Sequence, residues 1–100
     1  MILTGERINA QKALDYGLVA DIFPADSLVD DTLKIAKVIA SKGRISIMMA
    51  KEAVNAADEL SLQEGLRFER RLFHALFATS DQKEGMDAFL EKREPKFTHK

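Results

Sequence analysis

Carboxylates at helical spacing occur near the C-terminus, where Glu84 and Asp87, and then Asp87 and Glu91, lie one turn apart. Two neighbouring carboxyl groups can act as general acid and general base when their surroundings separate their pKa values. The segment around them contains few apolar residues to provide such surroundings. The pattern therefore favours solvent-exposed helix faces over an acid–base pair.

A basic cluster is formed by Arg67, Arg70, Arg71 and His74, which share one face of a predicted helix. Arginine binds phosphate groups through paired hydrogen bonds, so this face is a candidate phosphate site. The chain as a whole has a formal net charge of −1, and a short basic face in such a protein is more typical of a solvent-facing surface. Phosphate binding here is the weaker of the two interpretations.

Other catalytic and metal-binding patterns are missing from the sequence. There is no cysteine, which excludes disulfide and thiolate chemistry, and the two histidines, His74 and His99, are far apart. The five glycines occur singly, so neither a phosphate-binding loop nor a glycine-flanked nucleophilic serine is present. From the residues alone we predict no catalytic constellation and no metal site.

The overall charge and hydropathy also limit the classes of partner. A net charge of −1 supplies no general attraction for nucleic acid. No run approaches the ~20 apolar residues that a membrane-spanning helix needs. We therefore expect neither a nucleic-acid partner nor a membrane partner, and the hypothesis of nucleic-acid binding depends only on the basic cluster.

The segment Ser61–Thr79 is the part of the chain around which we expect the rest to be organised. At 100° per residue its apolar side chains span roughly 200°, whereas an ordinary amphipathic helix has a stripe of about 100°. Those side chains are Leu62, Leu66, Phe68, Leu72, Phe73, Ala75, Leu76 and Phe77. Such a helix needs other helices, or another chain, on two sides.

Glu69 projects from the middle of this apolar arc. An unpaired carboxylate is costly to remove from water. We therefore expect Glu69 to be buried and ionised, and held by an arginine, a lysine or the N–H groups at the start of a helix.

The N-terminal region, residues 1–25, is predicted to be a connector with one short helix. Asn9 can cap a helix over Ala10–Tyr16, and Gly17 can end it in a left-handed conformation. Leu18–Phe23 is apolar and extended, and Pro24 prevents it from continuing as a helix. That segment is either a connector or an edge strand whose sheet lies elsewhere.

Four longer helices are predicted over residues 26–93, followed by a tail over residues 94–100. The first opens at Asp26 or Ser27 and runs to about Ser41, where Lys42-Gly43 breaks it. The second covers Ile45–Glu59, with a small residue at every turn that allows close packing against a neighbour. Within these helices we expect an ion pair between Asp30 and Lys34, and Met48 is either a stray exposed side chain or a subunit contact.

The two remaining helices start at repeated capping patterns. Ser61–Glu64 has the capping-box pattern, and Ser80–Glu84 repeats it before a helix that ends at about Lys92 or Arg93. Glu94-Pro95 stops this last helix, and Phe97 gives the tail an apolar anchor. The fold class predicted from these patterns is all-α, with about five helices.

Several motifs resemble the C-terminal part of the crotonase superfamily, and enoyl-CoA hydratases in particular. The similarity covers essentially the whole chain. The motifs that carry it are Leu3–Ile8, Ala10–Ala13, Gly17–Val19, Ala50–Asn55, Phe77–Met86 and Ala88–Arg93.

The resemblance implies that the chain is a fragment, the helical trimerisation region of the crotonase fold without its ββα-spiral core. The parent enzyme adds water to 2-trans-enoyl-CoA in fatty-acid β-oxidation. Its two catalytic glutamates and its oxyanion hole would lie upstream of Met1, so no catalytic residue is assigned here and the fragment is expected to be inactive. Glu52, Glu64, Glu69 and Glu84 are not given that role.

The resemblance also implies ligands, partners and a location. Lys92 occupies the family position whose cation binds the phosphates of coenzyme A. Phe73 occupies the position that makes an apolar contact near the adenine, although Phe73 also fits a core position. An acyl-CoA thioester and a homo-oligomer, trimeric or hexameric, are the implied partners, with no cofactor. The implied location is the mitochondrial matrix in a eukaryote or the cytoplasm in a bacterium.

A different class of function is a free-standing helical protein-interaction module without catalysis. We expect that the chain is not a monomer, because its helices present more apolar surface than they can cover. A monomer would instead favour a self-contained helical domain.

Overall fold

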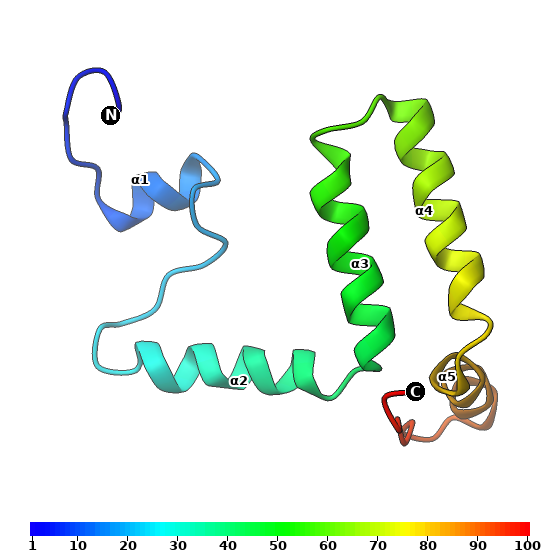
Figure 1. Cartoon of the computed structure of the whole chain (residues 1–100). Helices are drawn as coiled ribbons and strands as arrows, with labels where there is room; N and C mark the ends of the chain where they lie inside the picture. The colour runs from blue at the N-terminus through cyan, green and yellow to red at the C-terminus, as the bar shows by residue number, and fades with distance from the viewer. The chain divides into compact units, whose positions relative to one another are not determined.

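The computed structural model describes residues 1–100, and its regular secondary structure is entirely helical (Figure 1). The five helices are α1 (Ala10–Asp15), α2 (Leu28–Ala40), α3 (Arg44–Ala57), α4 (Leu62–Leu76) and α5 (Ser80–Glu91). The predicted all-α class with five helices is confirmed. The chain divides into two compact units, residues 1–36 and residues 37–100.

The first unit contains the short helix expected from its flanking residues. The side chain of Asn9 accepts a hydrogen bond from the backbone N–H of Lys12 at 2.8 Å, which caps α1. Gly17 follows the helix with φ +72°, a left-handed conformation that glycine adopts without steric cost. Leu18–Phe23 lies in neither a helix nor a strand.

The ion pair expected in α2 involves a different acid. Lys34 Nζ lies 2.6 Å from Oδ1 of Asp31, so the predicted pairing with Asp30 is wrong. Residues three apart are neighbours on a helix just as residues four apart are. The Lys34 ammonium first, and the Ser27 side chain second, lower the pKa of Asp31.

The helix α3 begins at Arg44, directly after the Lys42-Gly43 break. It forms an antiparallel pair with α4, joined by a short loop (Figure 1). Ala50, Ala53 and Ala57 of α3 line the groove between these two helices, as expected of small residues that permit close approach. Met48 lies on α3 and is 59% exposed, which both interpretations of that residue require.

The start of α4 is capped by Ser61, whose hydroxyl accepts from the N–H of Glu64 at 3.4 Å. The Glu64 carboxylate binds Arg67 at 2.9 Å, on the side away from the cap. The cap of α5 is Thr79, whose hydroxyl accepts from the N–H of Gln82 at 3.2 Å, so the pattern that starts at Ser80 is shifted by one residue.

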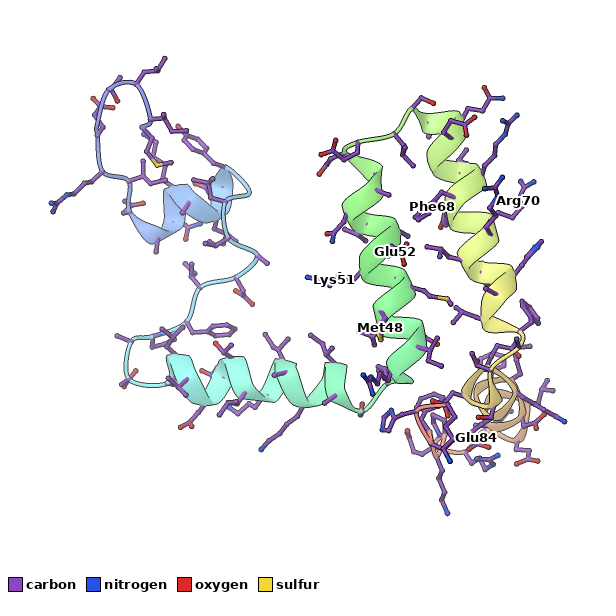
Figure 2. All side chains as sticks on the ribbon, viewed as in Figure 1. Met48, Lys51, Glu52, Phe68, Arg70 and Glu84 are labelled. Atoms are coloured by element: carbon purple, nitrogen blue, oxygen red, sulfur yellow. The ribbon has the colours of Figure 1, made fainter.

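The wide apolar face of α4 is covered on one side only. Phe68, Leu72 and Leu76 are half-buried, and Figure 2 shows Phe68 on the side of α4 that faces α3. Leu62 remains 80% exposed and Phe73 57% exposed. The only fully buried apolar residue of the chain is Ala88 in α5, so most of the apolar surface lies open.

Glu69 is exposed, and the prediction that it is buried and held by a basic group is wrong. Its side chain lines the groove between α3 and α4, which agrees with its place in the apolar arc. The chain's four salt bridges are formed by other carboxylates. Because only α3 packs against α4, the groove stays open and the Glu69 carboxylate remains exposed to solvent.

Candidate functional site

Lys92, the residue that follows α5 and caps its C-terminal end, is in a left-handed conformation with φ 54° and ψ 41°. Glycine is usual at such a position, and a residue with a Cβ atom costs about 1–2 kcal/mol there. The backbone N–H groups of Lys92 and Arg93 donate to the carbonyl oxygens of Phe89 and Ala88, at 3.3 and 3.0 Å. These bonds close the helix end and turn the chain back along α5.

Glu84 holds the first part of the returning tail. Its two carboxylate oxygens accept from the Arg93 guanidinium at 2.6 and 3.0 Å, and the backbone N–H of Lys96 donates to the same carboxylate at 2.7 Å. Figure 2 shows Glu84 on α5 beside this segment. The Arg93 guanidinium and then the Lys96 N–H lower the pKa of Glu84 to about 2. This carboxylate is therefore an ion-pair partner and unsuited to proton transfer near neutral pH.

Asp81 holds the second part of the tail. It is the only buried charged residue, with 4% of its surface exposed. The backbone N–H groups of Thr98 and His99 donate to its carboxylate at 2.7 and 2.8 Å, and the Thr98 hydroxyl donates at 3.3 Å. We call Asp81 and Glu84 together the tail clamp.

Further contacts complete the attachment of residues 93–100 to α5. The carbonyl oxygen of Lys100 accepts from the Ser80 hydroxyl at 2.9 Å and from the Asp81 N–H at 3.2 Å. The Phe97 ring lies over Gly85, as expected of an apolar anchor. On the other side of Asp81, the buried Gly43 leaves room for its carboxylate, since a Cβ atom there would lie 3.1 Å from Oδ2.

Phe73, the other residue matched to coenzyme A, is not a core residue in this chain. The residue is 57% exposed, and its ring packs edge-on against that of Phe77, with ring centroids 5.3 Å apart. It also lines an open groove of about 550 Å³ between α3 and α4, together with Met49 and Leu66. Phe73 and Lys92 lie on different helices, and no hydrogen bond or cation–π contact joins them.

The other candidate groups form no reactive arrangement. Asp87 and Glu91 are exposed, and Glu91 pairs with Arg93. Arg67 of the basic cluster is paired with Glu64. No group of three or more potential metal ligands occurs in the chain, and no helix has both the length and the apolar character to cross a bilayer.

Sequence reasoning missed the tail clamp. The Ser80–Glu84 pattern that contains both acids indicates a helix start, and it carries no sign that the same acids bind residues 9–18 positions further on. The only available signal is the proline stop followed by Phe97, which predicts that the tail returns to a surface.

Comparisons with known proteins agree with this fold. The model of the enoyl-CoA hydratase/isomerase family matches residues 1–100. A probable mitochondrial enoyl-CoA hydratase of Dictyostelium discoideum is 51% identical over 100% of this chain, which covers 36% of that protein. The mitochondrial enoyl-CoA hydratase of Pongo abelii is 52% identical over 97% of this chain and 33% of its own length.

A crystal structure of enoyl-CoA hydratase from Bacillus anthracis superposes with a TM-score of 0.92 at 39% identity, over 99% of this chain and 38% of that one. The chain thus spans about a third of the length of the relatives it matches. The match extends over every residue described above, including α5 and the tail. The chain belongs to the enoyl-CoA hydratase/isomerase family.

Proposed function

We propose that this chain is the C-terminal helical region of an enoyl-CoA hydratase that adds water to 2-trans-enoyl-CoA in fatty-acid β-oxidation. The observation that carries the proposal is the family match over all 100 residues, combined with the 36% of the Dictyostelium relative that the chain covers. The enzyme would work in the mitochondrial matrix of a eukaryote or the cytoplasm of a bacterium. This proposal is supported by relatives that are named mitochondrial and by relatives from bacteria.

In this proposal the chain does not carry the chemistry. Hydration of an enoyl thioester needs a carboxylate that deprotonates water, an acid that protonates the α-carbon, and N–H donors that stabilise the enolate. Glu84 is committed to Arg93, and Asp81 is committed to backbone N–H groups. Binding without transition-state stabilisation does not accelerate a reaction, so the chain by itself is inactive.

The structural role follows from the uncovered helix faces. Large apolar side chains of α3, α4 and α5 lie exposed, and contiguous patches of this kind are typical of surfaces that another protein element covers. They include Val54, Leu62, Leu66, Phe73, Phe89 and Leu90, and Phe77 directly after α4 is also exposed. We infer that the remainder of the subunit and neighbouring subunits of a trimer or hexamer cover them.

The chain would also supply part of the wall that binds coenzyme A. Lys92 is exposed and forms none of the four salt bridges, so its ammonium group is available to the phosphates. Phe73 presents an exposed ring that an adenine could contact.

The experiment is a chimaera in which this chain replaces the matched part of the Dictyostelium relative. Hydration of crotonyl-CoA is measured for the chimaera and for the 100-residue chain alone. Turnover by the chimaera, and none by the chain, supports the proposal. Turnover by the chain alone contradicts the assignment of the catalytic groups to the rest of the enzyme, and a folded but inactive chimaera favours a free-standing helical interaction module.

A further inference from the structure

We infer that the tail clamp positions Lys92 for the nucleotide end of acyl-CoA, with Glu84 as the residue that acts most directly. The inference rests on the proposed function, in which Lys92 binds phosphate. It assigns Glu84 a role as a positioning residue, because its carboxylate reaches Lys92 only through the next residue in the chain.

The backbone of Lys92 is held in a conformation that needs support from its neighbours. A lysine does not settle at φ 54° unless its surroundings compensate the steric cost. The compensation comes from the next residue, since the Arg93 N–H donates to the Ala88 carbonyl at 3.0 Å and the Arg93 guanidinium binds Glu84 through two bonds. Arg93 is thus fixed at both its backbone and its side chain, which fixes the turn at Lys92.

The rest of the tail is attached to α5 by the same two acids. The carboxylate that binds Arg93 also accepts the N–H of Lys96. One side chain therefore holds the tail on both sides of Pro95. Asp81 repeats this arrangement one turn earlier on α5, where it holds Thr98 and His99. The tail cannot relax away from α5 without breaking both attachments.

The ion pairs of Arg93 also affect the charges around Lys92. Arg93 binds Glu91 as well as Glu84, so both of these acids of α5 already have a cation partner. Lys92 itself is exposed and unpaired. The Lys92 ammonium at the end of α5 therefore has no acid partner in the chain, which suits a phosphate group of the substrate.

A cation that binds the remote phosphates equally in the ground state and the transition state changes KM and leaves kcat unaffected. It acts only on substrates that carry the nucleotide. Crotonyl-pantetheine has the same reacting thioester and lacks the nucleotide, so it reports on the reacting end alone.

The test uses the chimaera with Glu84→Ala and, as a matched control, Glu91→Ala. Both substitutions remove a carboxylate from Arg93, but only the first removes the acceptor of the Lys96 N–H. We expect Glu84→Ala to raise KM for crotonyl-CoA by about three- to fivefold, the size of an exposed ionic contact, with kcat unchanged and no effect on crotonyl-pantetheine. Glu84→Gln, which keeps one acceptor oxygen, should lie between Glu84→Ala and the unsubstituted chimaera, and Glu91→Ala should change KM by less than about twofold.

An equal change with both substrates, or a fall in kcat, would overturn the inference, because it would indicate a general structural effect. Lys92→Ala distinguishes a failure of the role inferred for Glu84 from a failure of the phosphate contact proposed for Lys92. If Lys92→Ala raises KM for crotonyl-CoA and Glu84→Ala does not, the inference fails and the proposed site stands; if Lys92→Ala has no effect, the proposed phosphate contact itself fails.

A second measurement needs no activity. Amide hydrogen exchange in the 100-residue chain should become at least about tenfold faster at Lys96 in Glu84→Ala, and should stay unchanged in Glu91→Ala. Equal exchange in both variants would overturn the clamp.

Discussion

Replacing Asp81 by alanine should release the last residues of the tail. Asp81 is 4% exposed, and its carboxylate accepts the N–H groups of Thr98 and His99 at 2.7 and 2.8 Å. A hydrogen bond to a charged group contributes about 1.5–3 kcal/mol, so the loss of two such bonds amounts to about 3 kcal/mol at the low end of that range. This corresponds to a change of about 100-fold in the local opening equilibrium.

Amide hydrogen exchange, read residue by residue by NMR, measures that opening directly. Exchange at Thr98 and His99 should become about 100-fold faster in Asp81→Ala, with a smaller change at amides in the middle of α4. Asp81→Asn keeps one acceptor oxygen, so its change in the free energy of local opening should be about half of that in Asp81→Ala. Unchanged protection at both amides in Asp81→Ala, or equal protection in the alanine and asparagine variants, would refute the assignment of Asp81 as the anchor.

The remaining predictions concern the end and the start of α5. Lys92→Gly should raise the free energy of unfolding by about 1 kcal/mol relative to Lys92→Ala, measured by urea titration, because glycine adopts a positive φ without steric cost; equal values would contradict the strain at this position. Glu84 has a pKa lowered from 4.5 to about 2, so its stabilisation is fully present above pH 4.5 and is lost as the pH falls towards 2. The NMR shift of the Lys96 amide should follow that titration, and a midpoint at the ordinary glutamate pKa would contradict the ion pair. Thr79→Ala should lower the stability of α5 by about 1 kcal/mol in the same urea assay, and no change would contradict its role as the N-cap.

The helices were predictable because the signals that set them are local. Asn9 and Gly17 bracket α1, Ser61 caps α4, and Lys42-Gly43 separates α2 from α3. Each of these residues acts on a backbone group a few positions away, so a single sequence contains the information. The errors at Asp30 and Ser80 are shifts of one residue between neighbours that have the same chemistry.

The surroundings of the helices were not predictable to the same extent. The apolar arc of α4 correctly places Glu69 towards α3, but burial depends on what covers the groove, and in this chain α3 covers only one side. The wide arc predicts that a cover is needed and does not say which protein element supplies it.

The candidate site likewise contains residues that the sequence could indicate and contacts that it could not. Lys92 and Phe73 were named from a family resemblance, which concerns motifs and not contacts. The tail clamp joins Asp81 to Thr98 and His99, 17 and 18 positions away, through backbone N–H groups that every residue type possesses. No side-chain pattern encodes such a partner, so only the structure shows it.

The central claim is that these helices form a surface built to be covered by more protein, and the molar mass of the chain in solution tests it most directly. Light scattering after size exclusion should give a multiple of 11.2 kDa, because Leu62, Phe73 and Phe89 lie exposed with no cover in a single chain. A folded species with a concentration-independent mass of 11.2 kDa would contradict the claim and would indicate a self-contained helical domain.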